Sequence, residues 1–144
     1  MGAFVLFDWN SVETMTAPQQ ATFLLDVAQA AWDMVIEQDT IMPQVLGYLA
    51  LARAALAGEG ARLPELLRFF HDADGTADVA AFADWVKDDE TAEGALSLAA
   101  FACAFSARVV AEQTGVTRLP DQVREALPEQ FADHRFTASC LGLA

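Results

Sequence analysis

A long uncharged stretch in the C-terminal half of the sequence constrains the fold more than any other feature. Residues 95–107 include no charged residue, proline or glycine. Apolar side chains here follow the i, i+3, i+4, i+7, i+11 spacing of one helix face, at Leu98, Phe101, Ala102, Phe105 and Val109. The opposite face carries only Ala, Ser and Cys as far as Arg108. Because a helix that is apolar on nearly all sides must be covered on several of them, we expect residues 91–114 to form the central helix of a bundle.

The same stretch is too short to be a membrane span. A helix needs roughly 20 apolar residues to cross a bilayer, and the uncharged run falls well short of that length. Its small side chains instead allow neighbouring helices to approach closely: Ala99, Ala100, Cys103, Ala104 and Ala107. The sequence therefore predicts a buried core helix and no membrane partner.

Composition favours a single all-α domain. Hydrophobic residues make up 54% of the 144 residues and charged residues 20%, as is typical of a folded globular chain. A chain of this length can bury a core without disulfides or metal. Alanine is abundant and β-branched residues are few, which favours helix over strand. We expect residues 1–144 to form one helical bundle of about six or seven helices.

Helix-start signals divide the N-terminal part into two helices. Thr16 fits an N-cap, with Pro18 in the first turn and Gln19 at the capping-box position. The helix is expected to run to about residue 38, with Trp32 beside a core face of Leu24, Val27, Ala28, Ala31 and Val35. A second start at residues 40–43 opens a helix that ends at the glycines of residues 58–60. Together the two helices predict a helical hairpin.

Shorter helices are expected on either side of the central one. Residues 63–71 form one of them. A last helix begins at Pro120 and keeps Val123, Leu127 and Phe131 at core spacing. Pro128 lies inside this span, so the helix either kinks there or gives way to a second short helix.

The charge balance excludes two classes of partner. Eight basic residues stand against 21 acidic ones, so the net charge is −13 at pH 7. Nucleic acids and anionic membrane surfaces are disfavoured because like charges repel. A basic protein is the natural complement, since opposite electrostatic fields steer two proteins together. An acidic surface can also serve solubility alone, and the sequence leaves both interpretations open.

The cysteines predict no disulfide framework, and the N-terminus predicts a cytoplasmic protein. Cys103 and Cys140 lack CxxC spacing, so they predict neither a disulfide framework nor a zinc site. Cys103 fits a small buried hydrophobe. The first residues lack the basic and long apolar regions of a secretion signal, which predicts a cytoplasmic location.

No catalytic signature stands out. The sequence has no GxSxG elbow, Walker loop or GxGxxG. Neither His71 nor His134 has the glutamate three residues earlier that a di-iron bundle requires. The aspartates of residues 72–78 do not complete a calcium loop, because Phe70 and Ala81 stand where its terminal acidic ligands belong. We expect no enzyme, no metal and no cofactor.

The most informative surface is predicted on a helix at residues 77–87. One stripe, expected to face the core, consists of Val79, Phe82, Ala83 and Val86. A second stripe holds Ala81, Asp84, Trp85 and Asp88, and so places an indole between two carboxylates. Such an arrangement is typical of a hot spot for a basic partner. The alternative is a solvated acidic face with the indole packed against a neighbouring helix. The candidate partner-binding residues are Asp72, Asp74, Asp78, Asp84, Trp85, Asp88, Asp89, Glu90 and Glu93.

The order of these features resembles the all-helical immunity proteins of bacterial polymorphic-toxin systems. The resemblance spans residues 21–123 and rests on helix order, on residues 23–25, on Trp32, on the acidic segment, and on residues 115–120 before the last helix. It implies a cytoplasmic protein that is made beside a toxin and blocks that toxin by direct contact, often at its active site. No residue-level binding motif comes with the resemblance. The acidic charge would suit a basic, nuclease-like toxin or another enzyme that binds polyanions.

Three other functions are open on the sequence. A scaffold or dimerisation domain would use the apolar ends, residues 4–7 and 141–143, as a homodimer interface. A nucleic-acid mimic would spread its carboxylates along an extended strip, whereas here they cluster between residues 72 and 93. A small-molecule-binding regulatory domain would have a pocket between helices, lined by Phe101, Phe105 and Trp32.

Overall fold

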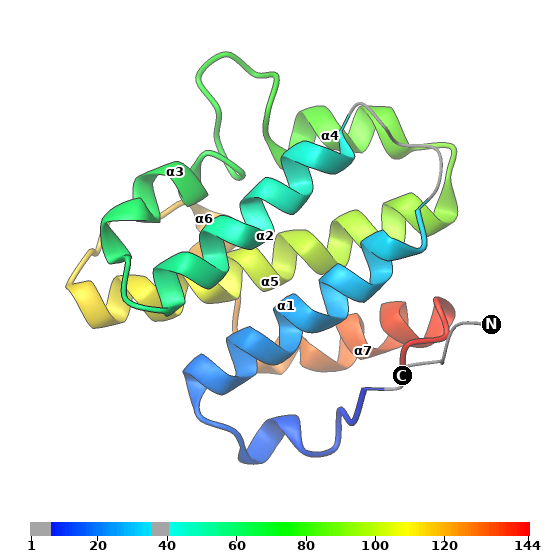
Figure 1. Cartoon of the computed structure of the whole chain (residues 1–144), viewed down its shortest axis with the longest axis horizontal. Helices are drawn as coiled ribbons and strands as arrows, with labels where there is room; N and C mark the ends of the chain where they lie inside the picture. The colour runs from blue at the N-terminus through cyan, green and yellow to red at the C-terminus, as the bar shows by residue number, and fades with distance from the viewer. Residues whose placement is uncertain (1–6, 36–40) are drawn as a thin grey trace.

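The computed structural model describes residues 7–35 and 41–144, and within these ranges the chain is helical with no strand (Figure 1). The α-helices are α1 (Ala17–Asp33), α2 (Met42–Leu56), α3 (Leu63–Leu67), α4 (Val79–Val86), α5 (Glu90–Thr114), α6 (Asp121–Arg124) and α7 (Phe131–Cys140). Three short 3₁₀ segments accompany them: η1 (Val12–Thr14), η2 (Gly60–Arg62) and η3 (Pro128–Gln130). The predicted all-α bundle is confirmed.

Helix α5 lies at the centre of the bundle, and its ends are fixed by two local features. The Asp89 carboxylate accepts a hydrogen bond from the Ala92 N–H at 3.1 Å, which caps the first turn. Gly115 ends the helix with a φ of +77°, a conformation that favours glycine. The predicted central helix, residues 91–114, is therefore confirmed to within one residue. Helices α1 and α2 cover one side of it (Figure 1), and α1 makes the most extensive contact.

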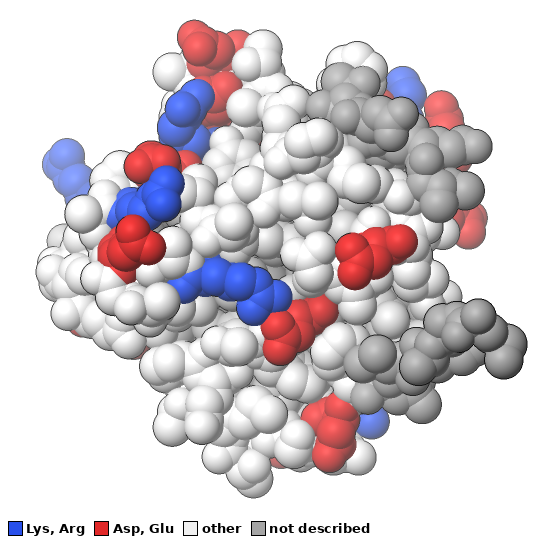
Figure 2. Space-filling view, viewed as in Figure 1, with Lys and Arg blue, Asp and Glu red and all other residues white. Residues whose placement is uncertain are grey.

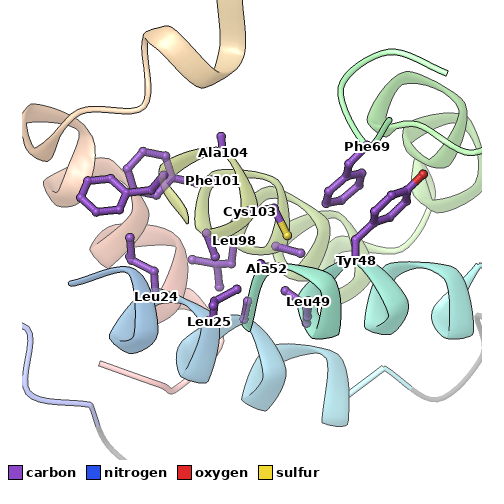
Figure 3. Packing of buried hydrophobic residues seen from close by; sticks show 14 of the residues in the cluster. Leu24, Leu25, Tyr48, Leu49, Ala52, Phe69, Leu98, Phe101, Cys103 and Ala104 are labelled. Atoms are coloured by element: carbon purple, nitrogen blue, oxygen red, sulfur yellow. The ribbon is translucent and has the colours of Figure 1, made fainter. Parts of the chain in front are cut away.

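The core lies between α5 and the α1–α2 hairpin. Leu24 and Leu25 of α1 and Leu49 of α2 point toward α5 (Figure 3). The whole predicted core face of α1 is buried, with no member more than 5% exposed: Leu24, Val27, Ala28, Ala31 and Val35. Trp32 is 0% exposed, so it fills the core rather than lying beside it. This burial of apolar surface is the main stabilisation of the hairpin on α5.

The start of α1 follows the predicted capping box. The Thr16 hydroxyl accepts from the Gln19 N–H at 3.3 Å, and the Gln19 side chain accepts from the Thr16 N–H at 2.9 Å. The helix ends at Asp33, earlier than residue 38, and the predicted start of the second helix at residue 40 lies outside the described residues.

An ion pair joins the two helices of the hairpin: Arg53 of α2 pairs with Asp26 of α1 at 2.8 Å. This ion pair lies at the surface, where such pairs add little stability.

The last predicted helix is interrupted at Pro128, so that α6 and α7 are separate helices joined through η3. Leu127 has an extended backbone, as residues before a proline do. Its side chain is 39% exposed, so the prediction that Leu127 lies on the core face is wrong. Because the backbone extends there, the four-residue spacing between Val123 and Phe131 does not follow one helix. Both of these outer residues are buried.

The C-terminal tail folds back onto the bundle. Leu143 is buried, and its carbonyl accepts a hydrogen bond from the Phe7 N–H at 3.1 Å. Helices α5 and α7 approach closely at Gly94, where an added Cβ would lie 3.3 Å from Leu141 Cδ1. The C-terminal part of the expected homodimer interface is thus packed against the chain's own core. Residues 4–6, which belong to its other part, lie outside the described residues.

Candidate partner-binding surface

Two of the candidate acids hold the turn before α4. Asp72 and Asp78 are 5% and 9% exposed. The Asp72 carboxylate accepts from the backbone N–H groups of Thr76 and Ala77, at 3.4 and 3.1 Å. Asp78 is the N-cap of α4: one carboxylate oxygen accepts from the Ala81 N–H at 3.0 Å, and the other accepts from the Asp72 N–H at 3.1 Å. Both carboxylates are therefore turned into the fold.

The environment of Asp72 keeps this carboxyl ionised. Burial acts to raise its pKa, but hydrogen bonds from Arg68, Thr76 and Ala77, together with the positive charge of Arg68, outweigh burial and lower the pKa below its ordinary value. The Arg68 guanidinium lies 3.2 Å from the carboxylate. The turn is thus held by a charged group that has a full set of donors.

Tyr48 of α2 fixes the same turn from the core side. Its hydroxyl donates to the Ala77 carbonyl at 2.6 Å, and its ring stacks on Phe69 with the centroids 4.6 Å apart (Figure 3). Burial raises the pKa of the Tyr48 hydroxyl. Because Ala77 comes just before the Asp78 cap, this hydrogen bond sets where α4 begins relative to α2.

The remaining candidate acids face solvent. Asp89 is half-buried as the cap of α5, while the exposed members are Asp74, Asp84, Asp88, Glu90 and Glu93. In the described residues, the ion pairs include none of these five. The unpaired charge of the acidic segment therefore lies in the turn before α4, on α4, in the link that follows it and on the first turn of α5.

Trp85 is a large, mainly apolar side chain within this acidic segment. Its side of α4 is directed outward, because Phe82 and Val86 on the other side are buried. The residue is 60% exposed, which excludes the alternative in which the indole packs against a neighbouring helix over most of its surface. Asp84 precedes it on the helix, whereas Asp88 lies in the turn after α4, because the helix ends at Val86, one residue earlier than predicted; both aspartates are exposed. We call Asp84, Trp85, Asp88 and Glu90 the Trp85 surface.

The basic side chains are mostly neutralised within the chain. Five of the eight lie in ion pairs with the chain's own carboxylates: Arg53, Arg62, Arg68, Arg108 and Arg124. On the α1–α2 side, acidic and basic side chains lie next to one another between wide uncharged areas (Figure 2). By contrast, Lys87 is the one basic residue between residues 72 and 93. The negative charge is therefore unevenly distributed along the chain, with eight acidic residues between residues 72 and 93.

A groove of about 520 Å³ lies on the other flank of α4. Its lining comes from the segment after α3, from α4, from α5, from the α6–η3 region and from α7: Phe70, Val79, Ala83, Val86, Glu93, Leu96, Ser97, Ala100, Phe101, Ala104, Gln122, Glu125, Gln130 and His134. The sequence did not predict this groove, although several of its lining residues, among them Glu93, Phe101 and the expected core stripe of α4, stood out for other reasons. Of the three residues expected to line a ligand pocket, only Phe101 lines it; Phe105 and Trp32 are fully buried in the core.

The described residues show no arrangement typical of metal or thiol chemistry. In residues 7–35 and 41–144, no three His, Cys, Asp or Glu side chains are grouped so as to hold a metal ion. Cys103 is fully buried, and burial raises the pKa of its thiol. Helix α5 is long and apolar enough to span a membrane by length and composition, but most of this apolar stretch is covered by the other helices, as in the core of a soluble protein.

Comparison of the chain with protein-family models, with curated protein sequences and with solved structures gave no significant match.

Proposed function

We propose that the chain is a cytoplasmic immunity-type protein that neutralises a cognate basic toxin by direct contact through the Trp85 surface. The observation that carries this proposal is the exposure of Trp85, which is 60% exposed. Its acidic neighbours Asp84, Asp88 and Glu90 form no ion pair within the described residues. Tryptophan is enriched at binding hot spots because it buries a large area with few rotatable bonds. The surrounding charge would select a basic partner and orient it.

The position of the Trp85 surface supports this role. Asp84 and Trp85 lie on α4, which is fixed at its start by the Asp78 cap and by the Tyr48 hydrogen bond to Ala77, and Glu90 lies in the first turn of α5. A preformed surface loses less conformational entropy on binding than a flexible one. The net charge of −13 would add long-range attraction to a basic toxin. Together these features support rapid and specific capture of a basic protein.

The experiment that tests the proposal uses the product of the gene immediately upstream of this one. This product is expressed with a tag together with the chain, and the two are co-purified and analysed by size-exclusion chromatography with light scattering. A stable complex of defined stoichiometry, accompanied by loss of the partner's toxicity, is the expected result. A harmless upstream product, or a toxic one that forms no complex with the chain, contradicts the proposal.

A further inference from the structure

The groove beside α4 has the length and shape of a short helix-binding site. On α5 its lining residues follow helical spacing from Glu93 to Ala104, at positions 93, 96, 97, 100, 101 and 104. At about 1.5 Å per residue, this stripe is about 16 Å long, or three helical turns. The facing wall is α4, through Val79, Ala83 and Val86. The groove is therefore an elongated, mainly apolar channel.

The charged groups of the groove lie at its two ends. Glu93 marks one end, in the first turn of α5. Glu125 marks the other, because the next residue, Ala126, accepts a hydrogen bond from Arg108, one turn beyond Ala104 on α5. No lysine or arginine belongs to the lining. An occupant with positive charge at both ends and an apolar centre would match this pattern.

An aromatic pair belongs to the lining of the groove. The His134 imidazole stacks on the Phe101 ring, with the centroids 3.9 Å apart and the planes inclined by 12°. Burial lowers the pKa of His134, against the opposing effect of Asp133, and so favours the neutral imidazole. The stacked rings add aromatic surface to the apolar lining of the groove.

We propose that this groove binds an amphipathic helix of a basic protein partner, with apolar residues on the floor and a lysine or arginine at each end of the helix. Apolar residues at i, i+3 or i+4, and i+7 of such a helix would lie along the three-turn stripe of α5. The carboxylates of Glu93 and Glu125 would pair with its terminal basic residues. The inference rests on the proposed function in one respect, namely that the partner is basic.

The test uses a synthetic probe, so that it does not depend on the toxin. The probe is a fluorescein-labelled helical peptide of about 14 residues, with leucines at helical spacing and lysines near both ends. Fluorescence anisotropy measures its affinity for the full chain. Ser97→Trp, which fills the groove from an exposed lining position, is expected to weaken binding at least about tenfold. Gln113→Trp, at an exposed position of α5 outside the groove, is the control and should leave the affinity unchanged.

A second pair of variants tests the charged ends. Glu93→Gln and Glu59→Gln each remove one negative charge from an exposed position, but only Glu93 lines the groove, and Glu59 lies outside the Trp85 surface. We expect Glu93→Gln to weaken binding of the lysine-ended peptide about threefold or more and Glu59→Gln to have a smaller effect. A peptide with glutamates in place of the lysines should not bind. Equal binding of both peptides, or equal affinity of all the variants, overturns the proposal.

Further outcomes distinguish failure of the groove inference from failure of the proposed function, and a partner helix from a second copy of the chain. Failure of the wild-type chain to bind the lysine-ended peptide rejects the groove inference even if the toxin is captured. Sedimentation velocity of the chain alone tests for self-association. A dimer that dissociates in the Ser97→Trp variant would identify a second copy of the chain as the occupant, and this result also overturns the inference. Conversely, peptide binding together with a harmless upstream product leaves the groove inference standing and rejects the proposed function alone.

Discussion

At the scale of single residues, Trp85 is the side chain on which the proposed recognition depends most. We expect Trp85→Ala to weaken binding to the toxin by about 2 kcal/mol or more, roughly 30-fold in affinity, because the indole would lose its buried contact area. Phe136→Ala is the matched control, since Phe136 is an aromatic residue of α7 that is 71% exposed. Isothermal titration calorimetry measures both variants. An equal loss for both, or no loss for Trp85→Ala, would remove this residue from the interface.

Tyr48 provides a test of how the turn before α4 is held. Tyr48→Phe keeps the ring that stacks on Phe69 and removes only the hydroxyl that donates to the Ala77 carbonyl. We expect the free energy of unfolding to fall by about 0.5–1.5 kcal/mol, the usual net contribution of one such hydrogen bond. Urea denaturation followed by circular dichroism measures the change. An unchanged free energy of unfolding would show that the hydroxyl does not stabilise the turn.

Asp72 should make the stability of the same turn depend on pH. Its pKa is lower in the folded chain than in an unfolded one, so its ionised form stabilises the fold at pH values above its ordinary pKa of about 4. This contribution is lost as the pH falls through the lower, folded-state pKa. Asp72→Asn should therefore be less stable than wild type at pH 7, and the difference should shrink below about pH 4. Thermal unfolding at pH 7, 5, 4 and 3 tests this; a difference that is independent of pH contradicts it.

At the scale of elements, helix α4 is expected to determine how fast the partner associates. The double variant Asp84→Lys/Asp88→Lys should chiefly slow association with the toxin and flatten its dependence on salt, since charges at an interface steer encounter. Glu13→Lys/Glu129→Lys changes the net charge equally at exposed positions away from α4, and so is the control. Stopped-flow association at several salt concentrations distinguishes the two. Equal slowing by both variants would mean that net charge alone directs encounter.

The elements that could be predicted from sequence are those with a local physical cause. The capping box at Thr16 and Gln19 fixed the start of α1, and Asp89 and Gly115 fixed the ends of α5. The last helix was only partly predictable, because Pro128 allowed a kink or a break. The extended backbone of Leu127 shows that the helix breaks there, an outcome that the proline favours but does not decide, because some helices continue through a kink at a proline.

At the scale of the whole molecule, the candidate site was predictable only in part. Helical spacing predicted Asp84, Trp85 and Asp88 on one stripe, but only the structure shows that all three are exposed and that α4 ends before Asp88. The inward position of Asp72 and Asp78 depends on donors that the turn brings to them. The groove combines residues from five regions between Phe70 and His134, and no local pattern in the sequence brings them together.

The measurement that tests the central claim most directly is rescue of a heterologous host from the upstream gene product. The host carries the wild-type chain or a variant with Asp84→Lys, Trp85→Ala and Asp88→Lys together, with circular dichroism used to confirm that the variant folds. We predict that the wild-type chain restores growth and that the folded triple variant does not. Full rescue by the triple variant, or no rescue by the wild-type chain, would contradict it.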